Sequence, residues 1–385
     1  MDRSRRWDKF KLVGLSIALS LLAGWALWVT SPKPELTSVA WRTSFDRAYA
    51  DRLRGEIVAE VSESLTLLHA LAALASTDAS ADAGKGAGAS ADPGAVDLVG
   101  SLLPYRDHEA VSAVSEALRA ADPESLAGIF AFEFRDGNLV RSLPHELPAF
   151  SRTLEPRLRS LAAFAWESGF REAFAASAAG FRLQLAGLLE RVRIDSIRSW
   201  LEAEFPAITH DAYRIVASPF DTGPAFSHAF SSDDPAFSEI VVYLGLAGEA
   251  HAPRPGAQAE VFAAIARHYV SRMTDRYIRI VNRVFANIAI WSPGDLDREP
   301  ADIFNDYMTL GSYVLYVQAV DPGAFDEVSE RVIDSMESIG YSRFEDFLGR
   351  LVDVYGRRRE NERLGMLYPR VVREAIRLAR EYESI

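Results

Sequence analysis

The sequence predicts a predominantly helical α+β fold. Over most of the 385 residues, apolar side chains recur about every 3.6 positions, the spacing that places them on one face of a helix. Two short runs, 213–220 and 239–246, are instead rich in β-branched and aromatic residues and are bounded by turn residues, so we expect them to be strands. Because 49% of the residues are hydrophobic and 25% are charged, the chain can fold around a sizeable core.

The first half of the chain, residues 33–205, is expected to be helical and to contain one linker. Segment 76–95 has no aromatic or branched aliphatic residue, so it cannot bury a core and is expected to be a flexible linker. The run 128–134 fits either a strand or a buried helical segment, because periodicity does not distinguish them. Helical patterns cover residues 35–76, 96–103, 108–121, 147–178 and 180–204.

The second half, residues 206–385, combines the two predicted strands with long helices. The stretch between the strands is expected to be a loop or a hairpin. A long amphipathic helix is expected over 257–290, after a segment that contains two prolines and a glycine. Further helices are expected over 300–319, 323–338, 343–356 and 359–382.

The uncharged apolar segment 12–32 is long enough to cross a membrane. At ~1.5 Å per helical residue it spans about 30 Å, the thickness of a bilayer core. Residues 1–11 carry five basic and two acidic side chains, a local charge of +3, which the positive-inside rule keeps in the cytoplasm. Trp25 and Trp28, near the far end, suit the membrane interface. We therefore expect a single-pass anchor in the cytoplasmic membrane and a periplasmic body.

A cleaved signal peptide is the alternative interpretation of the N-terminal segment. Its apolar region is usually about 7–15 residues long and is followed by a small-x-small cleavage site. Here the apolar run is longer, and no good site of that kind precedes Pro32. These features favour an uncleaved anchor.

The composition excludes several classes of site and partner. The net charge of −12, and of −15 beyond the basic tail, argues against a nucleic-acid partner. Without cysteine, the chain has no thiolate zinc site, iron–sulfur cluster or cysteine nucleophile. None of the seven histidines forms an HxH, HxxxH or HExxH pattern, and GxSxG, Walker A and dinucleotide-binding motifs are absent. We expect no cofactor and no metal.

Four stretches, taken in order, resemble a family of uncharacterised bacterial proteins regarded as HExxH zinc metallopeptidases of the gluzincin type. The resemblance covers roughly residues 60–380. Each stretch alone is unspecific, and the resemblance rests on the order that the stretches share with that family. It implies a zincin-like arrangement of a small sheet and helices in residues 206–385. The stretches are LLPYRDHEAVSAVSEALR (102–119), SWLEAEFPAITHDAYRIVASPF (199–220), EVFAAIARHYVSRMTDRYIRIVN (260–282) and FNDYMTLGSYVLY (304–316), with LYPRVVREA (367–375) closing the chain.

The resemblance also implies where the zinc ligands would stand. In that family the third stretch carries HExxH shortly before a Thr-acidic-basic-Tyr sequence, which here is Thr274–Tyr277. Counting back places the two ligand positions at Ala263 and Arg267, and the general-base position at Ala264. The fourth stretch should supply a glutamate as third ligand, and Asp306 stands there. The implied fold is that of a peptidase whose metal-binding motif is replaced.

The replacements are incompatible with zinc chemistry. Alanine has no donor atom, and arginine stays protonated and cannot coordinate a cation. Without a glutamate at position 264, no base activates a water molecule. Shifting the alignment by one residue would bring His268 to a ligand position but would make Ala264 the other. We expect Arg267 to take the place of the metal, with its guanidinium paired to Asp306; the alternative is that Arg267 points to solvent.

The sequence thus predicts a membrane-anchored, catalytically inactive, metallopeptidase-like protein of the bacterial envelope. It would bind a protein or peptide in the former cleft, or act as a scaffold. One alternative is an active hydrolase with another residue set, such as His228, Asp233 and Asp234 between the strands. A second alternative is a helical interaction domain unrelated to peptidases, in which no sheet would lie beside 257–290.

Overall fold

The computed structural model describes most of the chain from Thr37 onward. The predicted anchor, 12–32, lies outside the described residues, and so does nearly all of the predicted linker, 76–95. In the described part of the chain, no helix is both long enough and apolar enough to cross a membrane. The described residues are 37–76, 98, 100–221, 223–246, 256–293 and 296–383.

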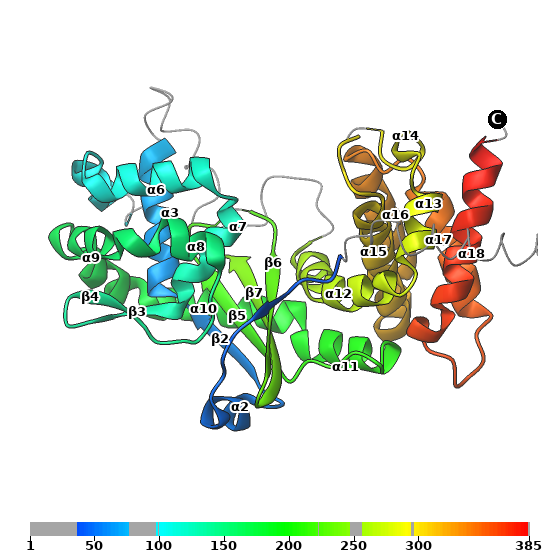
Figure 1. The fold of residues 1–385 in the computed structure, drawn as a ribbon, viewed down its shortest axis with the longest axis horizontal. Helices are drawn as coiled ribbons and strands as arrows, with labels where there is room; N and C mark the ends of the chain where they lie inside the picture. Colours follow the sequence, from blue (N-terminus) through cyan, green and yellow to red (C-terminus); the bar gives the residue numbers. More distant parts are fainter. Residues whose placement is uncertain are drawn as a thin grey trace, which may run out of the picture. The chain divides into compact units, whose positions relative to one another are not determined.

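A five-stranded mixed sheet forms the centre of the compact unit Thr37–Ile385 (Figure 1). Its strands are β1 (Ala40–Arg42), β2 (Ile57–Val61), β5 (Ala212–Ser218), β6 (Phe226–Asp233) and β7 (Ala236–Gly245). They lie in the order β1-β6-β7-β5-β2; only β6 and β7 are antiparallel, and the other neighbours are parallel. With helices on both faces of the sheet, the predicted α+β, predominantly helical class is confirmed.

The two strands predicted from the sequence are confirmed as β5 and β7. All seven residues of β5 are buried, because a central strand with helices on both sides of the sheet exposes neither face. This explains why the strand appears in the sequence as a continuous apolar run rather than an alternating one. The stretch between the two strands contains β6, which forms a hairpin with β7.

The helix predicted over 35–76 is wrong in its first part, because β1 and β2 lie there. Ile57 and Val58 are β-branched and favour extended backbone, and Gly55, at φ +87°, follows the short helix that precedes β2. Strand β2 pairs with β5, so the sheet joins residues from both halves of the sequence. The division expected at residue 205 therefore runs through a single sheet.

Helices from the first half of the chain cover one face of the sheet. The run 128–134 forms a 3₁₀ turn and then a strand, so both of its expected conformations occur. The helix predicted over 147–178 is interrupted at Gly169, whose φ of +68° is incompatible with a continuous helix. These elements are α2 (Arg47–Leu53), α3 (Glu63–Ser76), α6 (Glu109–Ala120), α7 (Pro123–Leu126), β3 (Phe132–Arg135), β4 (Asn138–Arg141), α8 (Pro148–Thr153) and α9 (Leu158–Glu167). Helix α10 (Phe170–Val192) follows them and packs into the cores on both faces of the sheet.

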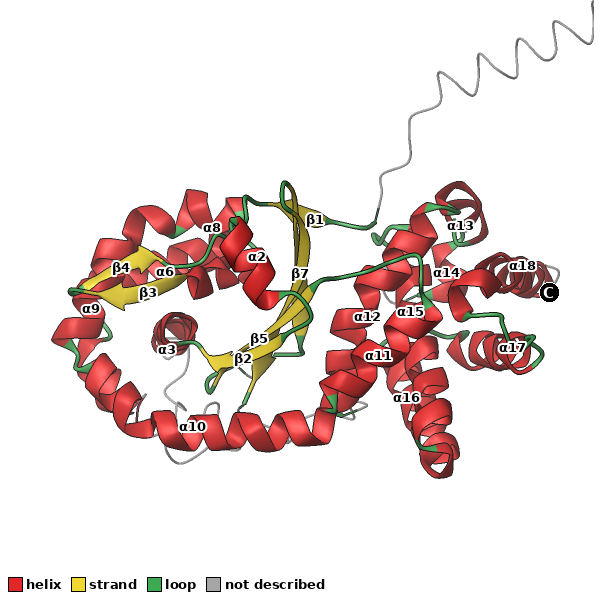
Figure 2. Ribbon diagram, turned by 90° about the horizontal axis from the view of Figure 1, so that it is seen from below, coloured by secondary structure: helices red, strands yellow, loops and turns green. Residues whose placement is uncertain are grey.

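Helices that follow α10 cover the opposite face (Figure 2). The helices predicted after residue 300 are confirmed with shifted ends. The helix predicted over 257–290 is divided into three, and at the first break Tyr277 stacks on Tyr368 at 5.9 Å. The elements are α11 (Ile194–Glu204), α12 (Ala257–Asp275), α13 (Ile278–Val284), α14 (Ile288–Trp291), α15 (Pro300–Val320), α16 (Phe325–Ser338), α17 (Phe344–Gly356) and α18 (Leu364–Glu383).

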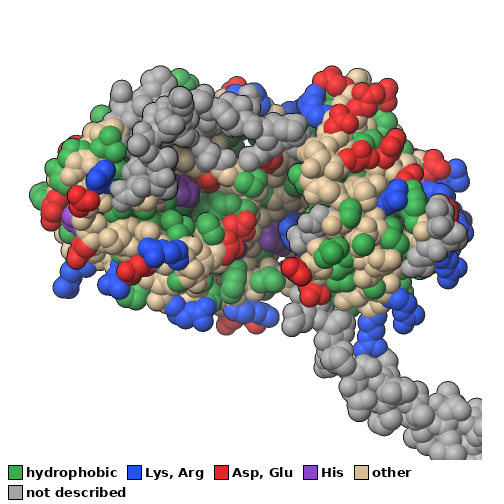
Figure 3. Space-filling model, turned by 90° about the horizontal axis from the view of Figure 1, so that it is seen from above, with side chains coloured by type: hydrophobic (Ala, Val, Ile, Leu, Met, Phe, Trp, Pro, Cys, Tyr) green, Lys and Arg blue, Asp and Glu red, His purple; other side chains and the backbone are tan. Residues whose placement is uncertain are grey.

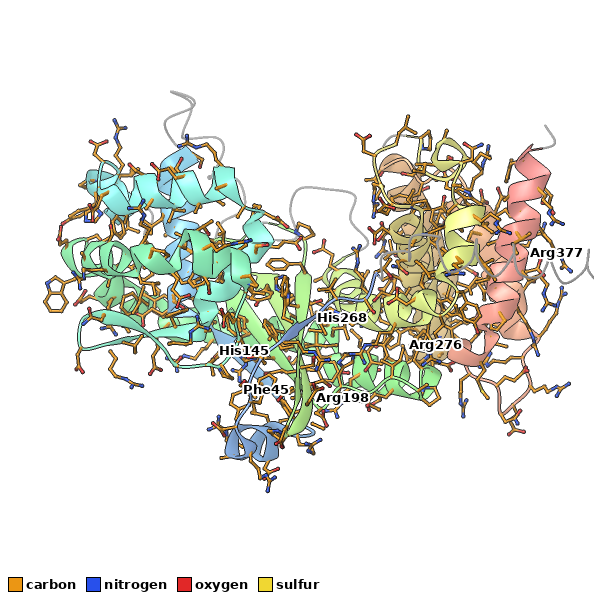
Figure 4. All side chains as sticks on the ribbon, in the orientation of Figure 1. Phe45, His145, Arg198, His268, Arg276 and Arg377 are labelled. Atoms are coloured by element: carbon orange, nitrogen blue, oxygen red, sulfur yellow. The ribbon has the colours of Figure 1, made fainter. Side chains whose placement is uncertain are left out.

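A buried carboxylate, Glu239 of β7, ties the sheet to the first group of helices. It accepts hydrogen bonds from the Tyr49 hydroxyl (2.8 Å), His145 Nε2 (2.9 Å) and Arg214 Nε (3.0 Å). These donors come from α2, from the loop before α8 and from β5, and Glu239 itself is 0% exposed. Figure 4 labels His145 and Phe45, whose rings meet edge to face at 5.5 Å.

The Glu239 carboxylate is ionised despite its burial. Burial raises its pKa, but the hydrogen bond from His145 and the charge of Arg214 outweigh burial and lower the pKa below its ordinary value. Burial lowers the pKa of His145, so its imidazole is neutral and donates through Nε2. Arg214 shares its charge with a second carboxylate, Glu60 of β2, at 3.1 Å. One anion therefore satisfies three donors from three separate segments.

Replacing Glu239 with leucine is expected to destabilise the fold by about 3–5 kcal/mol, since three buried donors lose their acceptor and Arg214 loses one of its two carboxylate partners. Urea unfolding of wild type and variant measures the loss. Glu327→Gln, which removes only the exposed ion pair to Arg331, is the control and should cost below about 1 kcal/mol. Equal losses in the two variants would show that Glu239 has no special structural role.

Candidate functional site

Helix α12 brings the two predicted ligand positions to one face, because positions 263 and 267 are four residues apart. Ala263 is half-buried, and the side chain of Arg267 is 50% exposed. Helix α15 packs against α12 and presents two carboxylates, Asp302 and Asp306, at the same spacing. The structure therefore places Ala263, Arg267 and Asp306 in the corner between these two helices.

The expected pairing of Arg267 with Asp306 is only partly formed. Nη1 of Arg267 lies 3.7 Å from Oδ1 of Asp306, and Nη2 lies 3.5 Å from Oδ1 of Asp302. At 3.7 Å the guanidinium and Asp306 attract each other without a hydrogen bond. The two side chains thus form an ion pair but no hydrogen bond, and other side chains supply the hydrogen bonds to Asp306. Arg267 lies beside two carboxylates and remains open to solvent.

Asp306 takes its hydrogen bonds from two side chains that the sequence did not indicate. Nη2 of Arg298 lies 2.6 Å from its Oδ2, and the Tyr341 hydroxyl donates to the same oxygen. Burial and the Asp306 carboxylate raise the pKa of Tyr341, so its hydroxyl stays protonated. We refer to the set Arg267, Arg298, Asp302, Asp306 and Tyr341 as the Arg267 cluster.

A carboxyl group on the other side of the sheet, Glu124 of α7, interacts with the Arg267 cluster. Burial and the charge of Asp122 raise the pKa of Glu124, and the charge of Arg267 acts in the opposite direction. The charge of Arg267 thus affects Glu124 of α7, which belongs to the helices that cover the opposite face of the sheet. Figure 3 shows the surface hollowed between the two groups, with acidic, basic and histidine side chains around the hollow.

The other two predicted positions, Ala264 and His268, face away from the Arg267 cluster. Ala264 is 8% exposed and packs in the core, where its carbonyl accepts a hydrogen bond from Ser227 Oγ (2.6 Å). His268 Nε2 lies 2.8 Å from the same Ser227 oxygen, under β6 (Figure 4). His268 is therefore not a ligand candidate in the corner between α12 and α15.

His268 belongs instead to a group of neutral histidines, of which His210 is buried and His228 and His268 are partly buried. Its ring centre lies 6.3 Å from that of His210, whose two ring nitrogens have no partner in the described part of the chain. Burial, together with the charges of His228 and Arg267, lowers the pKa of His268 to about 3. Burial lowers the pKa of His228 to about 4. The protein thus folds around imidazoles that cannot easily be protonated.

The hydrolase site considered between the strands is not assembled. His228 and Asp233 both lie on β6, five residues apart, so they are about 16 Å from each other at ~3.3 Å per residue. Asp233 is exposed and pairs with Arg42 of β1 at 2.6 Å. Asp234 follows in the turn to β7. These three residues therefore cannot act on one substrate atom.

A serine–histidine pair that the sequence did not indicate lies at the end of β5. Nδ1 of His69, on α3, is 2.8 Å from Ser218 Oγ, within the range of a nucleophile and its base. Burial lowers the pKa of His69, while the charge of Asp221 acts in the opposite direction. Ser218 is 0% exposed, so no substrate reaches its hydroxyl in this conformation. Long-range contacts of this kind leave no local sequence signal.

The segment before β1 is fastened to the end of α12 by one carboxylate. Asp275 accepts hydrogen bonds from Thr37 N (2.7 Å), Thr37 Oγ1 (3.1 Å) and Ser38 N (3.1 Å), and from the Ser38 hydroxyl. The chain then enters β1, which pairs in parallel with β6. This contact positions the N-terminal strand along the edge of the sheet that lies nearest to α12.

In the described ranges, no group of three or more histidine and carboxylate side chains is placed to hold a metal ion. Comparison of the chain with models of protein families, with curated proteins and with solved structures finds no match. The resemblance to gluzincin-type metallopeptidases therefore stays a prediction from the quoted stretches.

The buried histidines predict a stability that falls in acid. In the unfolded chain a histidine has a pKa near 6.5, so between about pH 6.5 and 4 the unfolded chain binds more protons than the folded one. The free energy of unfolding should have its full value above about pH 6.5 and should decrease as the pH falls through this window. His268→Gln, which removes one of these groups, should make the decline shallower. Urea midpoints measured from pH 8 to pH 4.5 test this; identical slopes for wild type and variant would contradict it.

Proposed function

We propose that this protein is a membrane-anchored binding protein of the bacterial envelope, built on a metallopeptidase-like fold but without metal catalysis. The observation that carries the proposal is the corner between α12 and α15. There, the positions that resemble zinc ligands are Ala263 and Arg267, and they face the carboxylates of Asp302 and Asp306. A mixed sheet lies against α12, which supports the zincin-like arrangement over a purely helical interaction domain.

The chemistry of this corner supports binding rather than hydrolysis. Neither Ala263 nor Arg267 can donate an electron pair to a metal, and the general-base position, Ala264, points into the core. The guanidinium already supplies the positive charge that the carboxylates would otherwise draw from a metal ion. Asp306, which is 22% exposed, is further neutralised by Arg298. The Arg267 cluster is therefore stable without an added cation.

Arg267 provides the group that would contact a ligand. Half of its side chain is exposed, and within the described residues its guanidinium forms two ion pairs, at 3.5 and 3.7 Å, so its N–H groups can still donate to an incoming oxygen. Peptide carbonyls and carboxylates are the acceptors that a guanidinium fork fits best. We therefore infer that the ligand is a protein segment or peptide that enters the hollow shown in Figure 3.

The proposal places this binding surface outside the cytoplasmic membrane. It rests on the apolar segment 12–32 and the basic residues that precede it. Only four residues separate that segment from Thr37, the first residue held by Asp275.

Fluorescein-labelled casein, an unfolded chain, serves as both ligand and substrate in the test. The full chain should bind casein, as measured by fluorescence anisotropy, without releasing labelled fragments. Arg267→Glu should weaken binding at least about tenfold, because it places a third acidic group beside two carboxylates.

Arg373→Glu, an exposed charge reversal on α18, is the matched control and should leave casein binding unchanged. Cleavage of casein that a chelator abolishes would establish the active-peptidase alternative. Binding that Arg267→Glu leaves unchanged would overturn the assignment of the Arg267 cluster, and so would an absence of binding.

A further inference from the structure

The outer edge of β2 carries backbone groups that pair with no other strand of the described sheet. Tyr213 N donates to Glu56 O, and Ser62 N donates to Ala217 O, both at 3.1 Å, which fixes the register of the parallel β2–β5 pair. In such a pair, alternate residues of a strand bond to the same neighbour. The even-numbered residues of β2 therefore bond to β5. The N–H and C=O groups of Ile57, Ala59 and Val61 point to the opposite, outer edge, where the described sheet has no further strand.

Helix α10 passes along this edge (Figure 2). Its first part, with Phe174 and Phe181, packs into the core on one face of the sheet. Its last part, with Leu185 and Val192, packs into the core on the other face. The helix must therefore cross the edge of the sheet, and it runs beside β2 instead of lying flat on either face.

A groove remains between the strand and the helix. It has a volume of about 440 Å³, within the range of small ligand sites. Ala59 and Val61 line it from the strand, and Phe174, Leu185 and Leu189 line it from the helix. The lining is mostly apolar, and one wall carries the free backbone edge of β2. This combination suits an extended peptide, which brings both backbone hydrogen bonds and alternating side chains.

The charged groups in the groove define the ligand further. Glu60 is already paired with Arg214 at 3.1 Å, so its charge is compensated. Arg182 donates from Nε to Ala178 O at 3.1 Å, and no carboxylate of the described residues pairs with its guanidinium. The groove therefore presents one uncompensated positive charge, although the chain as a whole carries −12.

We propose that the groove between β2 and α10 binds an extended peptide that adds to the sheet as a sixth strand, with small aliphatic side chains toward α10 and an acidic side chain on Arg182. The peptide pairs with the backbone of Ile57, Ala59 and Val61. This site is separate from the Arg267 cluster and does not depend on the function proposed for that cluster. It lies at the opposite edge of the sheet from β1.

Three fluorescein-labelled octapeptides of alternating valine and serine test the proposal on the full chain. One carries a central glutamate, one carries lysine at the same place, and the third is the glutamate peptide with alternate amides N-methylated. The glutamate peptide should bind, the lysine peptide should bind at least about tenfold more weakly, and the methylated peptide should not bind. Equal affinity of all three, or no binding at about 1 mM, would overturn the proposal.

Two variants separately test the backbone pairing with β2 and the recognition of the acidic side chain by Arg182. Ala59→Pro removes an N–H that faces the groove and keeps the ladder to β5, since proline is tolerated on an edge strand at such positions; it should abolish binding. Arg182→Glu should reverse the preference from the glutamate to the lysine peptide. Arg159→Glu, an exposed reversal on α9, is the control and should change neither affinity. If the preference for the glutamate peptide persists in Arg182→Glu, a residue other than Arg182 recognises the acidic side chain.

Crosslinking locates the site even where a variant alters stability. The chain has no cysteine, so Ala178→Cys and Ala179→Cys each introduce a single thiol, the first in the groove and the second outside it. A bromoacetyl derivative of the glutamate peptide should alkylate the first variant, and an excess of unmodified glutamate peptide should suppress the reaction. Equal alkylation of both variants would contradict binding in the groove.

Discussion

The fold depends on the buried carboxylate of Glu239. It lies at the centre of the sheet and collects hydrogen bonds from Tyr49, His145 and Arg214, which belong to segments far apart in the sequence. A buried anion is tolerated only where its partners are complete, so these segments are constrained to one arrangement. Through Arg214 and Glu60 the constraint extends to β2, whose other edge borders the groove beside α10. The sheet is thereby held as a rigid platform between two groups of helices.

The surfaces available for function follow from that platform. On one side, α12 is positioned by the sheet and faces α15, which brings Arg267 to the carboxylates of Asp302 and Asp306. The edge of the sheet nearest to α12 is formed by the short strand β1, and Asp275 holds the segment that precedes it. The other edge is formed by β2, and the groove beside α10 lies there.

The sequence predicts the central strands and the later helices well because their signals are local. Continuous β-branched runs mark β5 and β7, and strong amphipathic patterns mark the helices after residue 300. Strands β1 and β2 are missed because they are short edge strands, and their extended conformation depends on pairing with residues far along the chain. In the site, the closeness of Arg267 to Asp306 is predicted from the resemblance. Arg298, just before α15, and Tyr341, between α16 and α17, bond to that carboxylate, and no sequence motif marks either of them.

Zinc content is the decisive measurement for the proposal that the corner between α12 and α15 resembles a metal site whose ligands are replaced. Zinc is measured by mass spectrometry in the wild-type chain and in the double variant Ala263→His/Arg267→His after equilibration with zinc and desalting. We expect no bound zinc in the wild type and about one per chain in the variant, held by the two introduced imidazoles and Asp306. Stoichiometric zinc in the wild type, or none in a folded double variant, would contradict it.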